Sequence, residues 1–314
     1  VRETGRTYFE RNEANPLDED LIIVDEASML DISLFYHLLC ALKDGARLIL
    51  VGDIDQLPPV GAGEPLKDLM DWGYVPVVRL KHIFRQEEGS SIIENAALIR
   101  EGEMCVPDEA GEFRIIHASD DEDAYRVVMD LCRELNYGNE ENKMQLQVIS
   151  PMYRGVCGVD HLNESLQEMI HGEKVPDGMK FFPGDKVMQT RNDYEKGVYN
   201  GDVGIVWTAT PQKVFVRYFD KEVMYEGEER FDIQLAYAVT VHKSQGSEYE
   251  TVVFILRPSQ YNMLQRNLLY TGVTRAKRNT ILVTAPDALR RALATRHTGN
   301  RYSLFLPFLN HEAL

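Results

Sequence analysis

The stretch LIIVDEASMLDISLFYHLLCALKDGARLILVGD, residues 21–53, decides the fold of this chain. Its two apolar runs, residues 21–24 and 47–51, do not alternate with polar residues, which predicts strands buried on both faces of a parallel sheet. Apolar residues at helical spacing between positions 33 and 42 predict a helix that connects the two strands. Asp25, Glu26 and Asp53 follow the strands directly, at the edge where open α/β sheets bind ligands.

The rest of the chain continues this α/β pattern and interrupts it once. Helices are expected at residues 90–100, 124–135, 161–170 and 263–270, and further strands at 145–149, 252–255 and 280–283. Between residues 181 and 235, short β-type runs are separated by turn signals, which predicts a small inserted barrel. An oligonucleotide-binding barrel and a simple hairpin extension are the alternatives for this insert.

Composition and net charge exclude some classes of protein. With 314 residues, of which 44% are hydrophobic, the chain is long enough for two or three globular domains. Its 34 Lys and Arg against 50 Asp and Glu give a net charge of −16, which argues against a protein that coats nucleic acid through bulk positive charge. No apolar run reaches the ~18–20 residues that span a bilayer, so no membrane partner is expected.

The charge is distributed unevenly along the chain. Between Ala236 and Arg301, ten Lys and Arg residues stand against three Asp and Glu residues. That segment therefore carries +7, and the remainder carries −23. A narrow basic path for one nucleic-acid strand and a triphosphate is compatible with an acidic total.

The four cysteines, Cys40, Cys105, Cys132 and Cys157, are widely spaced and form no C-x-x-C pair. This spacing predicts neither a zinc site nor a disulfide framework. We expect small buried hydrophobic residues in a reducing, cytoplasmic setting.

Several short segments carry side chains suited to nucleotide chemistry. An acid placed as Asp25 is can hold Mg²⁺, and a neighbouring Glu26 can orient or deprotonate an attacking water; a solvated strand end is the alternative. Gln56 lies in a loop stiffened by two prolines and has an amide suited to sensing a γ-phosphate, although a plain Pro-rich turn has the same composition. Arg85 has a guanidinium group suited to a bidentate phosphate contact, and Arg275 lies just before a predicted strand.

A second kind of segment suits a phosphodiester backbone. Residues 237–248, YAVTVHKSQGSE, combine hydroxyl donors, a lysine and a glycine, which are groups that position a strand without reading its bases. In the insert, Tyr194, Tyr199, Trp207, Phe215 and Tyr218 are candidates for base stacking, although aromatic residues at strand spacing more often form a core.

Taken in order, these segments resemble the motifs of the superfamily-one helicases, and most closely those of the RecD-like group, which includes the exonuclease V alpha subunit. Asp25–Glu26–Ala27–Ser28 is similar to the Walker B motif, and residues 52–56 to the third motif. Residues 84–86, 240–248 and 270–275 are similar to the fourth, fifth and sixth motifs, and Ser150–Pro151 to an additional strand-contacting segment. The insert falls where RecD-like enzymes carry an SH3-like subdomain.

The resemblance implies a role for each matching residue. Asp25 would bind Mg²⁺, Glu26 would act on the catalytic water, and Gln56 would couple the γ-phosphate to the bound strand. Arg85 and Arg275 would act as arginine fingers reaching the triphosphate across the cleft between two RecA-like domains. Nucleotide binding would also involve Gly246 and Glu248, and the residues implied at single-stranded DNA are Ser150, Pro151, Thr240, His242, Lys243 and Ser244.

The resemblance also implies the domain organisation and the partners. The expected fold is α/β, with two RecA-like P-loop NTPase domains and an SH3-like all-β insert. The expected segments are 1–80 for the last part of domain 1A, 81–180 and 236–314 for domain 2A, and 181–235 for the insert. ATP and Mg²⁺ would be the cofactors, and single-stranded DNA and other subunits of a recombination nuclease complex the partners. The implied activity is 5′ to 3′ translocation by an ATP-dependent DNA helicase.

One family feature is missing from the sequence. A Walker A loop needs G-x-x-x-x-G-K-[ST], and these 314 residues contain no Gly-Lys dipeptide. We interpret the chain as a fragment without its phosphate-binding loop and expect it to hydrolyse ATP poorly by itself. A non-catalytic DNA-binding or docking subunit, and the helicase part of a conjugative relaxase, are the alternative functions.

Overall fold

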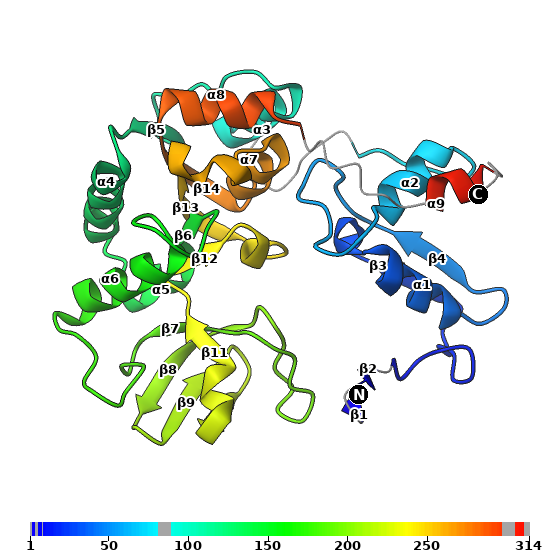
Figure 1. The fold of residues 1–314 in the computed structure, drawn as a ribbon, viewed down its shortest axis with the longest axis horizontal. Helices are drawn as coiled ribbons and strands as arrows, with labels where there is room; N and C mark the ends of the chain where they lie inside the picture. Colours follow the sequence, from blue (N-terminus) through cyan, green and yellow to red (C-terminus); the bar gives the residue numbers. More distant parts are fainter. Residues whose placement is uncertain (1, 4–5, 8, 81–88, 297–304, 311–314) are drawn as a thin grey trace. The chain divides into compact units, whose positions relative to one another are not determined.

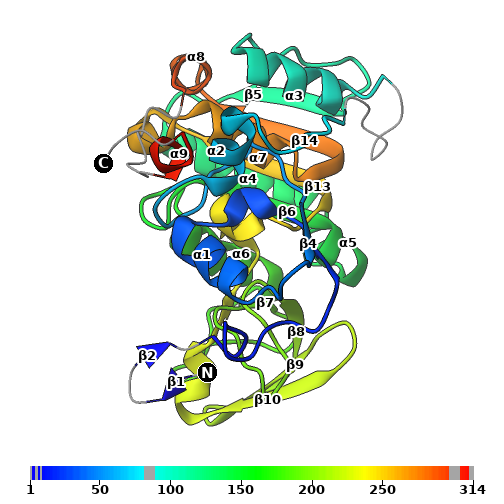
Figure 2. The same ribbon diagram turned by 90° about the vertical axis from the view of Figure 1, so that its right-hand side faces the viewer.

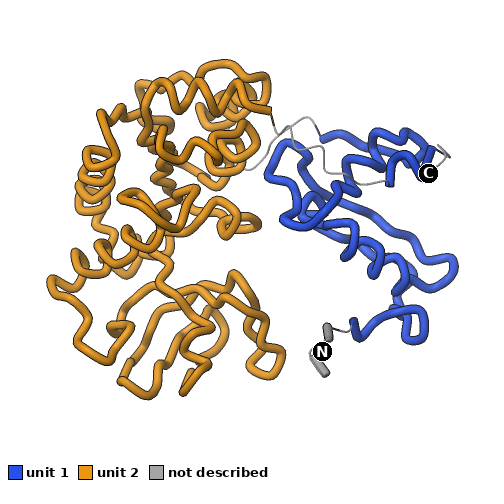
Figure 3. Tube along the Cα trace, viewed as in Figure 1, with its two compact units in different colours: residues 1–82, 297–314 blue, residues 83–296 orange. Residues whose placement is uncertain are grey.

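The computed structural model describes residues 2–3, 6–7, 9–80, 89–296 and 305–310. The chain divides into two compact units, which Figure 3 distinguishes by colour. Unit 1 comprises residues 1–82 and 297–314, and unit 2 comprises residues 83–296.

Unit 1 contains the predicted strand–helix–strand segment (Figure 1). Strands β3 (Leu21–Val24) and β4 (Arg47–Leu50) pair in parallel, with Val24 opposite Leu50. Helix α1 (Ile32–Cys40) connects them and begins at Asp31, whose carboxylate accepts a hydrogen bond from the Leu34 amide. The remaining elements are β1 (Arg2–Glu3), β2 (Arg6–Thr7), the 3₁₀ turn η1 (Ala27–Met29), α2 (Pro65–Trp72) and α9 (Phe305–Leu309).

The prediction that β3 and β4 are buried on both faces is wrong for this structure. Side chains along both strands alternate between exposed and half-buried, and Ile23 and Ile49, which pair with each other, are 61% and 46% exposed. The reason is that, in the part of the chain that the structure describes, these two strands form a sheet of their own. Apolar runs of this kind therefore indicated a strand correctly but not its degree of burial.

The C-terminal helix α9 belongs to unit 1, whereas the sequence grouped residues 236–314 together. The Trp72 indole donates a hydrogen bond to the Leu309 carbonyl, and the Phe305 ring packs edge-on against Phe35 at 5.8 Å. These contacts join residues far apart in the chain, so the local sequence around α9 could not predict that this helix belongs to unit 1.

Unit 2 is built around a five-stranded parallel sheet with the order β12-β6-β13-β14-β5. Its strands are β5 (Phe113–His117), β6 (Leu146–Ser150), β12 (Ala238–Thr240), β13 (Tyr249–Leu256) and β14 (Ala276–Thr284). Its helices are α3 (Ser91–Glu101), α4 (Asp121–Glu134), α5 (Glu140–Gln145), α6 (Val159–His171), α7 (Arg266–Val273) and α8 (Pro286–Ala294), with 3₁₀ turns η3 (His242–Ser244) and η4 (Pro258–Met263).

Helices cover both faces of this sheet (Figure 1). Val253 and Ile255 face a core that includes α4 and α6. Phe254, which points the opposite way, lies so close to Gly272 of α7 that a Cβ there would be 2.5 Å from its ring. This sheet is therefore buried on both faces, as expected for parallel strands.

The predicted insert is a five-stranded antiparallel sheet with the order β10-β9-β8-β7-β11. Its elements are β7 (Lys186–Gln189), β8 (Val203–Ala209), β9 (Lys213–Arg217), β10 (Glu222–Glu226), the 3₁₀ turn η2 (Gly227–Phe231) and β11 (Ile233–Leu235). Within unit 2 it lies at one end, beyond β6 and β12 (Figures 1 and 2). Val187, Val206, Val216 and Ile233 contribute to its own apolar core.

A buried carboxylate joins the insert to the parallel sheet. Asp185 is fully buried and accepts hydrogen bonds from Gln167 and His171 of α6, from the Phe182 amide and from the Tyr237 hydroxyl. Since Phe182 precedes the first strand of the insert and Tyr237 follows its last, a single side chain fixes both connections.

Lys186, beside this carboxylate in the sequence, is a fully buried cation. Its ammonium group donates to the Leu146 carbonyl at 3.1 Å and to Gln147 Oε1 at 2.9 Å. Burial, with a smaller effect of Lys143, lowers the pKa of Lys186 to about 7.

This lowered pKa predicts a pH dependence of stability. Between about pH 7 and the unfolded pKa of about 10.4, the unfolded chain binds more protons at this site, so its contribution to the free energy of unfolding rises with pH. We expect Lys186→Met to flatten this rise, measured by urea denaturation between about pH 7 and pH 9. The exposed Lys174 supplies the control variant Lys174→Met. Equal pH slopes in the two variants would contradict the prediction.

Candidate functional site

The Asp25–Glu26 turn at the end of β3 has an unusual backbone. Glu26 has φ 50° and ψ 37°, the left-handed region that non-glycine residues seldom adopt. Its amide donates to Asp25 Oδ1 at 2.8 Å, and the Ala27 amide donates to the Val51 carbonyl at 2.7 Å. Asp25 is exposed and Glu26 is half-buried. The turn therefore holds two adjacent carboxyl groups in a fixed, strained arrangement beside the end of β4.

Gly52, directly after β4, permits this close approach. A Cβ at residue 52 would lie 2.8 Å from the Ser28 amide nitrogen and 3.2 Å from that of Ala27. No larger residue fits without a shift of the backbone. The glycine of the predicted third motif thus positions the predicted Walker B turn.

Two buried polar atoms beside this turn lack partners within the part of the chain that the structure describes. They are Ser28 Oγ and Gln56 Oε1. The Gln56 amide nitrogen is 3.5 Å from Asp53 Oδ2, which directs the side chain toward the loop after β4. Buried polar atoms are normally hydrogen-bonded, so these two indicate a polar group that the described residues do not supply.

These residues fit a Mg²⁺-bound nucleotide. Mg²⁺ in nucleotide sites takes one or two carboxylates and completes its coordination with phosphate oxygens and water. Asp25 and Glu26 offer such carboxylates, and Ser28 and Gln56 offer a hydroxyl and an amide. Across the described ranges, no group of three or more His, Cys, Asp or Glu side chains is arranged to hold a metal ion.

The second candidate surface is the turn after β12, in unit 2. Thr240 and Ser244 are 4% and 0% exposed. Thr240 Oγ1 accepts a hydrogen bond from the Lys243 amide, and Ser244 Oγ donates to the Val241 carbonyl. These two predicted DNA-binding residues therefore shape the turn, and their hydroxyls are already engaged in it.

His242 and Lys243 are the half-buried members of this turn. The Lys243 ammonium donates to Asn200 Oδ1 of the insert at 2.7 Å. Partial burial lowers the pKa of Lys243 from its usual value. Asn200 is a contact that the sequence did not reveal, because the two residues are separated by 43 positions.

Ser150 and Pro151, at the end of β6, are buried. Ser150 Oγ donates to the Cys157 carbonyl at 2.6 Å and accepts from Gln260 Nε2 at 3.2 Å. The side chains exposed in the loop that follows are those of Tyr153 and Arg154. Since Ser150 pairs with Thr240, this loop and the turn after β12 emerge from the same edge of the sheet.

Arg275 is 2% exposed. Its guanidinium donates to the Thr271 carbonyl at 3.1 Å and to the Ser247 carbonyl at 3.2 Å. These bonds join the end of α7 to the segment between η3 and β13, so within unit 2 the predicted arginine finger also has a structural role.

Two further predicted nucleotide residues lie in the same segment. Gly246 has φ +74° and open space around it, and Glu248 lies 3.6 Å from the ammonium of Lys277. Arg85 falls outside the described residues.

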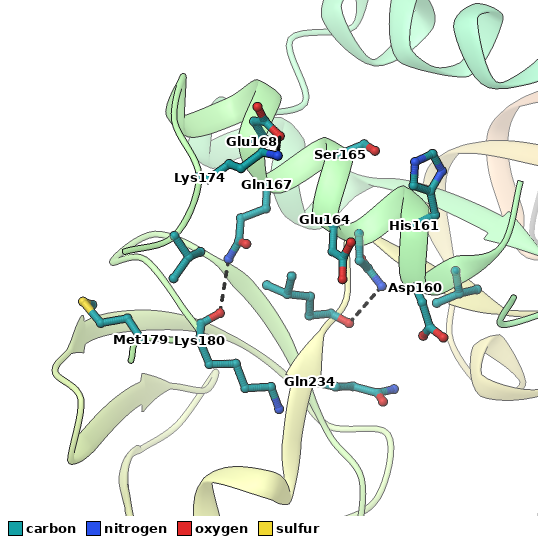
Figure 4. Close-up of a pocket in the computed structure, with 14 residues that line it drawn as sticks. Asp160, His161, Glu164, Ser165, Gln167, Glu168, Lys174, Met179, Lys180 and Gln234 are labelled. Carbon is teal, nitrogen blue, oxygen red and sulfur yellow. Dashed lines mark hydrogen bonds and ion pairs between the residues drawn. The ribbon is translucent and has the colours of Figure 1, made fainter. Parts of the chain in front are cut away.

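A cavity of about 600 Å³ lies elsewhere in unit 2 (Figure 4). It follows α6 and the start of the insert and contains none of the predicted site residues. Gln167 and Asn163 donate hydrogen bonds from α6 to the Lys180 and Leu235 carbonyls across it. We interpret this cavity as part of the interface between the insert and α6.

The prediction of buried cysteines holds for three of the four, and Cys40 is half-buried. All four cysteines are free thiols, and Cys105, Cys132 and Cys157 are buried, which raises the pKa of each to about 12. No helix in the described part of the chain is both long and apolar enough to cross a bilayer.

Comparison with known proteins agrees with this arrangement. Residues 4–121 match the AAA domain, residues 162–218 the SH3 domain of ATP-dependent RecD-like DNA helicases, and residues 235–283 the UvrD-like helicase C-terminal domain. The ATP-dependent RecD2 DNA helicase of Deinococcus radiodurans is 39% identical over 277 residues, which cover 87% of this chain and 37% of that protein. The chain belongs to the RecD-like helicases of superfamily one.

A second relative also matches most of this RecD-like chain. The RecBCD enzyme subunit RecD of Mycolicibacterium smegmatis is 34% identical over 315 residues, which cover 94% of the chain and 56% of that protein. The chain thus spans 37% and 56% of the lengths of these two relatives. Membership in this P-loop helicase family implies the use of a nucleotide.

Solved structures support the fold. The Pif1 helicase from Bacteroides in complex with ADP-AlF3 and ssDNA has a TM-score of 0.58 at 19% identity, over 99% of this chain and 80% of that one. Pif1 helicase from Candida albicans has a TM-score of 0.57 at 20% identity, over 93% and 77% of the two chains. The predicted α/β class with an SH3-like insert is confirmed.

Proposed function

We propose that the full-length protein containing this RecD-like chain is an ATP-dependent DNA helicase that moves 5′ to 3′ on single-stranded DNA. The observation that carries this proposal is the strained Asp25–Glu26 turn, which holds two adjacent carboxyl groups at the end of β3. Its support from relatives is the 39% identity to a protein named as an ATP-dependent RecD2 DNA helicase.

The chemistry proposed for unit 1 is transfer of the γ-phosphoryl group of ATP to water. Asp25 would hold the Mg²⁺ ion, which neutralises phosphate charge during such transfers. Glu26 would orient the water and accept its proton as the new P–O bond forms and the bond to the leaving ADP breaks. Gln56 would donate a hydrogen bond from Nε2 to the γ-phosphate and would couple the loss of this phosphate to the bound strand.

For the strand, we propose that His242 and Lys243 contact the phosphodiester backbone. Thr240, Ser244 and Ser150 would position these contacts through the buried hydrogen bonds described above, and the buried Pro151 would fix the chain direction after Ser150. Arg275, Gly246, Glu248 and Arg85 remain the proposed nucleotide contacts. Because one relative is named as a RecBCD enzyme subunit, subunits of a recombination nuclease are proposed as further partners.

The test uses the natural full-length protein. We expect ATP hydrolysis that single-stranded DNA stimulates, and we expect Lys243→Gln to reduce by about 1 the slope of log affinity against log salt concentration, since one phosphate contact is lost. Lys213→Gln, at an exposed residue paired with Glu226 on the insert, is the matched control and should keep the slope. Absence of DNA-stimulated hydrolysis by the full-length protein would overturn the proposal.

A further inference from the structure

The loop between β7 and β8 carries two exposed tyrosines. This loop lies beside the turn after β12, where Lys243 is the proposed phosphate contact. Tyr194 is 74% exposed and Tyr199 is 47% exposed. Their rings form an edge-to-face pair, with centroids 5.9 Å apart and an interplanar angle of 74°. An exposed aromatic pair on a loop buries little apolar area in the fold, so packing alone does not account for it.

Hydrogen bonds hold this loop in one conformation. Asp193 and Val198 form a backbone bridge through bonds of 2.7 and 3.0 Å, and Val198 is fully buried in the core of the insert. The Asp202 carboxylate accepts from the Tyr199 amide at 2.8 Å. Lys221 donates to the Gly197 carbonyl from the neighbouring turn. The two rings are therefore presented by a pre-organised backbone, which lowers the entropy cost of binding.

The loop also contacts the turn after β12 directly. Asn200, which follows Tyr199 in the chain, accepts the 2.7 Å hydrogen bond from Lys243. A nucleic-acid backbone bound at Lys243 would consequently have its bases within reach of the tyrosine pair. Stacking on aromatic faces tolerates any base, as a motor that moves along arbitrary sequence requires.

The other three aromatic candidates of the insert lack this combination, and Phe215 among them is half-buried. Trp207 is 59% exposed, but its ring is covered by the Arg217 guanidinium, 4.2 Å from the ring centroid. Tyr218 is buried, and its hydroxyl lies 2.7 Å from that of Tyr225. Among the five aromatic candidates in the sequence, Tyr194 and Tyr199 are thus the exposed pair on the loop whose Asn200 contacts Lys243, the proposed phosphate contact.

From these observations we propose that Tyr194 and Tyr199 form a base-stacking subsite for single-stranded nucleic acid, which extends the strand path from Lys243 onto the insert. This inference rests on the proposed function, because it requires a strand at Lys243.

The test measures binding of a fluorescent oligothymidylate to the full-length protein and its variants. The double variant Tyr194→Ala/Tyr199→Ala is expected to bind about tenfold or more weakly with an unchanged salt slope, because stacking involves no phosphate. Tyr194→Phe/Tyr199→Phe, which keeps both rings, should retain affinity, and Trp207→Ala is the control for loss of an exposed aromatic residue. Thermal unfolding of each variant verifies that the insert remains folded.

An oligonucleotide with abasic positions distinguishes the loss of base stacking from a change in the conformation of the loop. With abasic sites across the tyrosine pair, wild type and the double alanine variant should bind equally. If wild type binds the intact strand and the double variant binds it as tightly, the subsite is overturned while the proposed function stands. If wild type does not bind single-stranded DNA, the proposed function itself fails.

Discussion

Glu26→Gln is expected to lower the ATP turnover number of the full-length protein by about 10²–10⁴-fold, because a glutamine cannot accept the proton of the attacking water. The substitution preserves side-chain length, and the turn keeps its bonds from the Glu26 amide to Asp25 and from the Ala27 amide to Val51. Binding of the nucleotide and of single-stranded DNA should therefore persist. Steady-state hydrolysis with saturating single-stranded DNA measures the effect.

The control for this prediction is Glu19→Gln, at an exposed acid just before β3. Backbone strain adds a second readout, because Glu26 occupies the left-handed region at φ 50°. Glu26→Gly should relieve this strain and raise the free energy of unfolding by up to about 1 kcal/mol while also abolishing turnover. Retention of wild-type turnover by Glu26→Gln would remove Glu26 from the proposed mechanism.

Asp185→Ala is expected to reduce the free energy of unfolding of unit 2 by about 3 kcal/mol or more. The substitution removes the acceptor of the His171, Phe182 and Tyr237 donors and leaves Gln167 with only its bond to the Lys180 carbonyl. Each unsatisfied buried donor costs about 1–3 kcal/mol, although neighbouring groups relax in part. Urea denaturation monitored by tyrosine and tryptophan fluorescence measures the loss.

The exposed Asp177, in the loop after α6, provides the control Asp177→Ala, which should change stability by less than about 0.5 kcal/mol. Because Asp185 joins both connections of the insert, we also expect proteolytic cleavage near residues 180–186 to accelerate in Asp185→Ala. Equal stability of the two alanine variants would show that the buried hydrogen bonds contribute nothing net.

Local sequence patterns predicted the elements of this chain well. The runs at residues 21–24 and 252–255 became β3 and part of β13, and the periodic segment at 161–170 lies within α6. The turn signals after residue 181 correctly indicated an inserted group of short strands. These features depend on backbone preferences and apolar spacing over a few residues, which the sequence states directly.

The degree of exposure of individual side chains was harder to predict. The family resemblance implied that Ser150, Thr240 and Ser244 lie at DNA, and the structure places their hydroxyls in buried hydrogen bonds. Conversely, Ile23 and Ile49 are exposed although their apolar runs indicated burial. The same side chain can line a turn or face solvent, and only the neighbouring elements determine which.

By itself, the sequence therefore determined the fold class, the order of the motifs and the carboxylate pair Asp25–Glu26, since each depends on residues close together in the chain. Only the tertiary structure revealed that Lys243 contacts Asn200 and that Asp185 accepts a hydrogen bond from the Tyr237 hydroxyl. Those partners lie 43 and 52 positions apart, and their approach depends on how the insert packs against α6 and β12. The physical reason is that hydrogen bonds and burial depend on the distance between atoms in the folded protein. The separation of two residues along the chain does not give this distance.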